Sequence, residues 1–154
     1  MKRRDQVAMT RDEYLNFLAT EGYTLQLATN GPKGFPHLTA LWYALVDDFV
    51  CFNTYATSQK AMNILRDPRV TGMVEEGTKY SELRGVVVEG RAERVVDDDA
   101  ARHANLLISK RYGGAGTAGA SSPAPPLPRS RAVFRIVPQA VYSWDHTKLP
   151  RGVH

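Results

Sequence analysis

Apolar and polar residues alternate along most of the chain with the two-residue period of β-strands. The alternating runs are separated by clusters of Gly, Pro, Asn and Asp, which are the usual residues of turns. The pattern predicts strands at residues 24–29, 37–45, 49–54, 69–75 and 84–96, and further strand segments at 131–137 and 140–144. Short turns join the first three strands, so we expect them to form an antiparallel meander.

Helical spacing replaces this alternation in three places. A capping box formed by Thr10 and Glu13 opens a helix that ends near residue 21. Either Thr57 or Ser58 caps a short helix over about residues 59–65. Acidic residues at 97–99 open a third helix, which ends near residue 111 at a pair of basic residues.

These elements predict a mainly β (α+β) fold, a six- to seven-stranded antiparallel barrel with a few flanking helices. Gly90, inside the longest predicted strand, indicates a bulge or a barrel corner. The length of 154 residues fits a single domain over residues 1–154. Residues 113–128 consist almost entirely of Gly, Ala, Ser and Pro, which predicts a flexible loop within it.

Composition and charge reduce the number of functional classes to consider. The net charge of +4 is scattered, whereas nucleic-acid-binding domains concentrate basic residues in a stripe, so no nucleic-acid partner is expected. No apolar run reaches the roughly 20 residues of a membrane span, and the basic N-terminal stretch lacks the apolar core of a secretory signal. The single cysteine, Cys51, favours a cytoplasmic location. The four histidines are far apart in sequence, so no metal site is predicted.

The segment 53–63, with the sequence NTYATSQKAMN, is the strongest candidate for chemistry. It joins the end of a strand to the start of a helix, where free backbone amides carry partial positive charge. The hydroxyls of Thr57 and Ser58 and the ammonium of Lys60 add donors there, as in a phosphate site. The alternative is a capped surface helix with a solvated lysine.

Three segments of the chain also resemble a known family. They are LATNGPKGFPHLTALWY, TSQKAMNILRDPRV and LRGVVVEGRAERV, in that order. They resemble the pyridoxamine 5′-phosphate oxidase-like split β-barrel superfamily, and within it the flavin/deazaflavin oxidoreductases of actinobacteria. The resemblance implies a homodimer with two cofactor sites at its interface. It also implies that the cofactor is FMN or the deazaflavin coenzyme F420.

The resemblance implies roles for individual residues as well. Lys60 would contact the cofactor phosphate, within a segment that includes Thr57, Ser58, Gln59 and Asn63. The ring would lie along the strand with His37, Leu38, Thr39 and Trp42, and Trp144 would form a wall of its pocket. Asn53 and Thr54 would reach the polar tail of the cofactor.

Several of these residues have simpler interpretations. Trp42 and Tyr43 are adjacent, so they face opposite sides of a strand and one of them belongs to the core. His37 can be a surface residue, Trp144 a core residue, and Asn63 a partner of the backbone near the helix end.

The functional prediction is hydride transfer between a bound F420 and a small, electron-poor organic substrate. Lys60 with Arg66, Arg69 or Arg84 would supply the basic groove that the long anionic tail of F420 needs. The alternatives are an FMN-binding oxidoreductase and a flavin-binding module without catalytic activity. Pyridoxamine phosphate oxidation ranks below these, because the chain is short and lacks an arginine-rich C-terminal motif.

Overall fold

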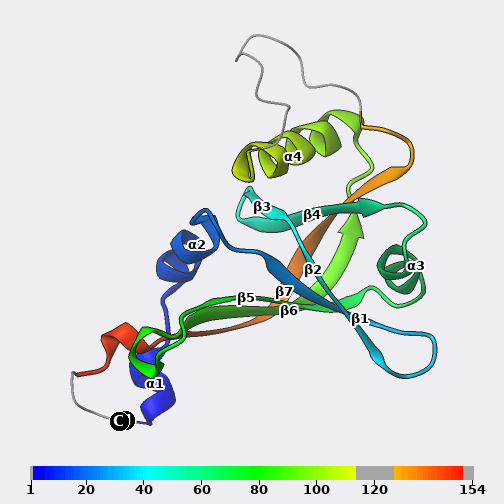
Figure 1. Cartoon of the computed structure of the whole chain (residues 1–154). Helices are drawn as coiled ribbons and strands as arrows, with labels where there is room; N and C mark the ends of the chain where they lie inside the picture. Colours follow the sequence, from blue (N-terminus) through cyan, green and yellow to red (C-terminus); the bar gives the residue numbers. More distant parts are fainter. Residues whose placement is uncertain (1, 114–126, 151–154) are drawn as a thin grey trace.

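One curved antiparallel sheet organises the protein, with helices packed against it (Figure 1). The computed structural model describes residues 2–113 and 127–150. The strands are β1 (Leu25–Asn30), β2 (Pro36–Leu41), β3 (Tyr43–Val46), β4 (Phe49–Tyr55), β5 (Arg69–Glu76), β6 (Arg84–Arg94) and β7 (Arg131–Asp145). The helices are α1 (Arg3–Val7), α2 (Arg11–Ala19), α3 (Gln59–Arg66) and α4 (Asp98–Arg111), with single 3-10 turns at Tyr80–Glu82 and His146–Lys148. None of the described helices has the length and apolar character needed to span a membrane.

The predicted fold class is confirmed, and the seven strands lie in the order β2-β1-β5-β6-β7-β4-β3. The capping box at Thr10 is present, although α2 ends at Ala19 rather than near residue 21. The strand predicted at residues 84–96 ends at Arg94. Helix α1 was not predicted from the sequence. It is only five residues long, and it depends on packing against β7, where Arg4 lies over the ring of Tyr142.

The single strand predicted at residues 37–45 is wrong, and so is the meander built on it. Strand β2 pairs with β1, and β3 pairs with β4, but β2 and β3 are the two opposite edges of the sheet. The inward positions continue without a break through Leu41, Tyr43 and Leu45, all of which contact the core. Alternation therefore predicted the buried face correctly, but it carries no information on which strand is the partner.

A single residue, Trp42, joins the two edges of the sheet. Consecutive Cα atoms are about 3.8 Å apart, so the last residue of β2 and the first of β3 must be close neighbours. The sheet has to curl until its edges meet at this corner, which makes it a nearly closed barrel. The interior is filled by apolar side chains from both halves, including Leu27, Phe52 and Val86, each of which is fully buried.

The C-terminal end of α4 holds this corner in place. The Tyr112 hydroxyl donates to the Tyr23 carbonyl (2.6 Å) and accepts from the Tyr43 amide (3.3 Å). The Tyr112 ring stacks on Trp42, with centroids 4.8 Å apart and an interplanar angle of 4°. Arg111 donates to the carbonyls of Ala19 and Thr20 at the end of α2, and so ties that helix to the same point.

Strand β7 connects the two halves of the barrel. Its first residues pair with β4, and residues Phe134–Asp145 pair with β6. The register shifts at Gly90, as predicted, and leaves Gln139 of β7 as the extra residue of a bulge. A Cβ atom at Gly90 would lie 2.1 Å from the Val137 carbonyl oxygen, so only glycine fits there. The two segments predicted at 131–137 and 140–144 are therefore one bulged strand.

The loop predicted at residues 113–128 lies mostly outside the described residues, at 114–126. Tyr112 and Gly113 precede that stretch, and Leu127 and Pro128 follow it.

The corner contacts lead to a stability prediction. Tyr112→Phe leaves the amide of Tyr43 and the carbonyl of Tyr23 without their shared partner. We expect a loss of about 1–2 kcal/mol in the free energy of unfolding, measured by urea denaturation. Tyr55→Phe is the matched control, because the Tyr55 side chain is 57% exposed and its hydroxyl has no hydrogen bond within the described residues. Equal stability of the two variants would contradict the proposed role of the corner.

Candidate functional site

The N-terminus of α3 is built from residues of β4 and of the helix itself. Ser58 is the N-cap, and its hydroxyl accepts from the Ala61 amide (3.2 Å). The hydroxyl of Thr54, buried at the end of β4, lies 3.0 Å from that of Ser58. The prediction left Thr57 and Ser58 open as caps, and the structure assigns the cap to Ser58. Thr57 is exposed beside it.

Lys60 extends over this cluster. Its ammonium donates to the Thr54 hydroxyl (3.3 Å), which is a neutral partner. No carboxylate of the described residues lies within 4.0 Å of the ammonium. Burial lowers the pKa of Lys60, and the positive charge of Arg131 lowers it further. The site therefore holds two neighbouring cations that the described part of the chain does not neutralise.

A second polar network lies along the next turn of α3. The Asn63 side chain is fully buried, and its amide nitrogen donates to the Thr29 hydroxyl on β1 (3.0 Å). Its amide oxygen accepts from Gln59 (2.7 Å) and from Arg66 (3.3 Å). Asn63 therefore fixes the helix to the barrel through side chains. The alternative interpretation, in which it bonds the backbone near the helix end, is wrong.

His37 lies opposite Thr29 in the pairing of β1 with β2. His37 and Thr39 project from the same face of β2, because they are two residues apart. The His37 Nδ1 atom and the Thr39 hydroxyl oxygen are both buried, and neither has a hydrogen-bond partner among the described residues. Unpartnered buried polar atoms are costly, at about 1–3 kcal/mol each, so two of them on one face point to a missing ligand or partner.

The remaining predicted site residues lie apart from this group in the single chain. The Asn53 amide donates to Asn105 on α4 (2.6 Å), on the opposite face of β4 from Thr54. Leu38 projects outward and is 67% exposed. Trp42 is 51% exposed at the barrel corner, about 16 Å along the strand from His37. Trp144 packs against Gly85 on β6. As predicted, Trp42 and Tyr43 face opposite sides, and Tyr43 is the core residue.

The arginines expected to extend the basic groove already have acceptors. Arg66 donates to the Asn30 carbonyl and to Asn63. Arg69 is paired with Asp67 (2.7 Å), and this contact, with a further one from Asn30, holds the pKa of Asp67 well below its usual range. Arg84 is paired with Glu76 and lies over the ring of Phe17.

Arg131 is the residue of this site that sequence reasoning missed. It is paired with Tyr55 in the ladder between β4 and β7, and its guanidinium lies 3.9 Å from the centre of the Tyr55 ring. This long-range pairing brings it close to Lys60, and no local pattern in the sequence could indicate it. Its only signal was its position at the start of a predicted strand.

The comparisons with known proteins point to one family. The model of the pyridoxamine 5′-phosphate oxidase family matches residues 10–145. None of the curated proteins matches the chain.

Solved structures share the fold along most of the chain. The conserved hypothetical protein Rv2991 from Mycobacterium tuberculosis is 37% identical, with a TM-score of 0.82, over 100% of this chain and 97% of its own. An F420 reductase is 25% identical, with a TM-score of 0.62, over 82% of this chain and 94% of its own. An FAD-binding protein from Mesorhizobium loti is 22% identical, with a TM-score of 0.64, over 88% of this chain and 94% of its own.

The buried Asn63 network gives a second stability prediction. Asn63→Ala leaves the buried Thr29 hydroxyl without a partner and removes the acceptor of Gln59, and we expect a loss of about 2 kcal/mol in the free energy of unfolding. The matched control is Asn16→Ala on the exposed face of α2, with an expected change within about 0.5 kcal/mol.

A double-mutant cycle with Thr29→Val tests the contact itself. We expect a coupling energy of about 1 kcal/mol between residues 29 and 63, because each single change removes the same hydrogen bond. Additive effects would show that Asn63 stabilises the protein without Thr29.

Proposed function

Because the chain belongs to the pyridoxamine 5′-phosphate oxidase family, we propose that it is an oxidoreductase that transfers hydride between bound F420 and a small, electron-poor organic substrate. The observation that carries this proposal is the pair Lys60 and Arg131 at the N-terminus of α3, which lacks a carboxylate partner within the described residues. The likeness to an F420 reductase, 25% identical over 82% of this chain, supports the choice of cofactor class.

The residues at the N-terminus of α3 suit a phosphate. The first amides of a helix have no acceptor within the helix, and of these amides the Ser58 hydroxyl accepts a hydrogen bond only from that of Ala61. The amides of Gln59 and Lys60, the exposed Thr57 hydroxyl and the Lys60 ammonium would hold the cofactor phosphate. A phosphate there would neutralise the repulsion between Lys60 and Arg131, which share no other anion in the described part of the chain.

The inward face of β2 suits the polar edge of a ring system. His37 and Thr39 would supply donors or acceptors to it, because both carry an unpartnered polar atom. When bound, the deazaflavin or flavin supplies the hydride chemistry, and the chain supplies binding, orientation and exclusion of water. This division of labour fits a site in which we identify no acid–base pair among residues 2–113 and 127–150.

Two other functions stay open in this proposal. FMN has a single phosphate, which the α3 site could hold by itself. A split barrel that binds a flavin without turnover would use the same residues. A cofactor that is bound tightly but never reoxidised by quinones, enones or nitro compounds would favour the binding module.

We also propose that two chains associate through the outer face of the sheet. The strand registers place Ala40, Gln26, Met73, Val87 and Tyr142 in one row across β2, β1, β5, β6 and β7. Leu38 stands in the adjacent row, and a cavity of about 320 Å³ opens on this face beside Ala28, Thr71 and Glu89. Apart from Gln26 the row is apolar, and a second chain there would cover this apolar row. It could also bring Trp42 or Trp144 of one protomer toward the α3 site of the other.

Titration of the purified protein with F420 and, separately, with FMN tests the cofactor assignment through ring fluorescence. We expect F420 to bind at micromolar or lower concentration. Lys60→Ala should weaken binding about tenfold or more, because it removes a charge-assisted hydrogen bond. Lys79→Ala is the control, since Lys79 is exposed and distant in the fold on the Tyr80–Glu82 turn. Absence of binding of both cofactors would refute the proposed function.

Sedimentation or light scattering tests the dimer. We expect a species of twice the chain mass of 17.1 kDa. Met73→Glu places a charge in the middle of the apolar row and should shift the protein toward monomer. Val96→Glu is the control, because Val96 is 84% exposed outside that row. A monomeric parent protein that binds F420 fully would contradict the interface proposal and leave the cofactor assignment intact.

A further inference from the structure

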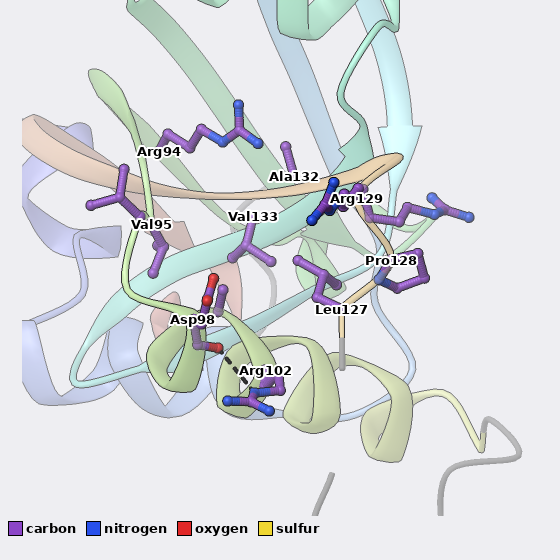
Figure 2. Close-up of a pocket in the computed structure, with 12 residues that line it drawn as sticks. Arg94, Val95, Asp98, Arg102, Leu127, Pro128, Arg129, Ala132 and Val133 are labelled. Carbon is purple, nitrogen blue, oxygen red and sulfur yellow. Dashed lines mark hydrogen bonds between the residues drawn. The ribbon is translucent and has the colours of Figure 1, made fainter. Parts of the chain in front are cut away.

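A cavity of about 650 Å³ lies between the end of β6, the first turns of α4 and the start of β7. Figure 2 shows Arg94 and Val95 on one side, Leu127, Pro128 and Arg129 on another, and Asp98 and Arg102 on α4. Its volume falls in the range of about 300–1,000 Å³ that is typical of small-molecule sites. None of the residues predicted from the sequence to bind the cofactor lines this cavity.

The charge around the cavity is strongly unbalanced. Four arginines line it, at positions 94, 102, 129 and 131, against one carboxylate, that of Asp98. Arg102 is paired with Asp99 and also donates to the Asp98 carbonyl. For the other three arginines, no carboxylate of residues 2–113 and 127–150 lies within 4.0 Å.

The backbone that carries two of these arginines is fixed. The Ser130 carbonyl accepts from the Ala56 amide (2.8 Å), and the Arg131 amide donates to the Pro128 carbonyl (2.8 Å). Arg131 then enters the ladder with β4. The backbone from which Arg129 and Arg131 project is therefore set before any ligand arrives, which lowers part of the entropic cost of binding.

The floor of the cavity strengthens the electrostatic attraction. Ala132 and Val133 are buried beneath it, and Val95 and Leu127 add apolar surface. Charges next to apolar walls are screened less than charges in open solvent, so each interaction with an anion is stronger.

We propose that this cavity is a second anion-binding site, which takes a small molecule with several carboxylate or phosphate groups. Arg94, Arg129 and Arg131 bind its charges by fork-shaped hydrogen bonds. Arg131 lines this cavity, and its charge also acts on Lys60, so the two sites share one cation. The anion has two possible sources: a free polyanion, or the glutamate tail of an F420 whose phosphate lies at Lys60. The second source rests on the function proposed above, and the first does not.

Inorganic tripolyphosphate, followed by calorimetry, probes the cavity without any cofactor. The test variant is the double change Arg94→Ala/Arg129→Ala, and we expect it to weaken tripolyphosphate binding about tenfold or more. The control is the double change Arg3→Ala/Arg11→Ala, which removes the same number of positive charges from residues that do not line the cavity. It should change the affinity less than about twofold. The unfolding midpoint of each variant checks that the fold is intact.

The second arm compares F420 with and without its glutamate tail. If the tail occupies the cavity, the parent protein binds the tailed form more tightly, and the double variant abolishes the difference. Equal affinity for the two forms, together with tripolyphosphate binding that depends on Arg94 and Arg129, identifies a free polyanion as the ligand.

Two results would overturn the proposal. The first is that neither tripolyphosphate nor tailed F420 loses affinity in the double variant. The second is that Lys60→Ala, and not the double variant, abolishes tripolyphosphate binding, which would place the anion at α3 alone. In either case, binding of the tail-free F420 to the parent protein would leave the proposed oxidoreductase function standing.

Discussion

The fold depends on one constraint: a single residue, Trp42, joins the two edge strands of a seven-stranded sheet. The sheet cannot stay open, because its two edge strands, β2 and β3, are joined by this one residue. Curling closes the apolar interior, and the contacts of Tyr112 and Arg111 hold the point of closure against the end of α2. The point of closure is therefore held by the hydrogen bonds of Tyr112 and Arg111 and by the stacking of Tyr112 on Trp42, while the apolar interior fills the barrel behind it.

The same closure creates the candidate site. Because β7 pairs with β4 in one half and with β6 in the other, the start of β7 lies beside the end of β4 (Figure 1). That pairing sets Arg131 next to Tyr55 and within electrostatic reach of Lys60. The same start of β7, with the turn before it, forms one wall of the arginine-lined cavity. The position of Arg131 between these two features of the fold therefore depends on the pairing of β7 with β4.

Local signals in the sequence predicted the parts of the structure that depend on local energies. The cap at Thr10, a cap at Thr57 or Ser58, the strands at β1, β4, β5 and β6 and the bulge at Gly90 each follow from residues within a few positions of one another. Strand pairing does not follow from such local signals. The alternation of side chains determines which face of a strand is buried, but it carries no information on which strand pairs with it. The exchange of partners at Trp42 was therefore missed, and with it the approach of Arg131 to Lys60.

The distribution of partners among the cations distinguishes stabilising charges from binding charges. Arg69 and Arg84 are held by carboxylates, and each reaches an acceptor that holds turns or strands together. Lys60, Arg94 and Arg131 have no carboxylate partner in the described part of the chain. Arg94 and Arg131 nevertheless line the same cavity, and the charge of Arg131 acts on Lys60. Like charges kept close together destabilise the folded state, and a protein tolerates that cost mainly where a ligand offsets it. An anion bound near the ends of β4 and β6 would therefore offset this repulsion and stabilise the fold.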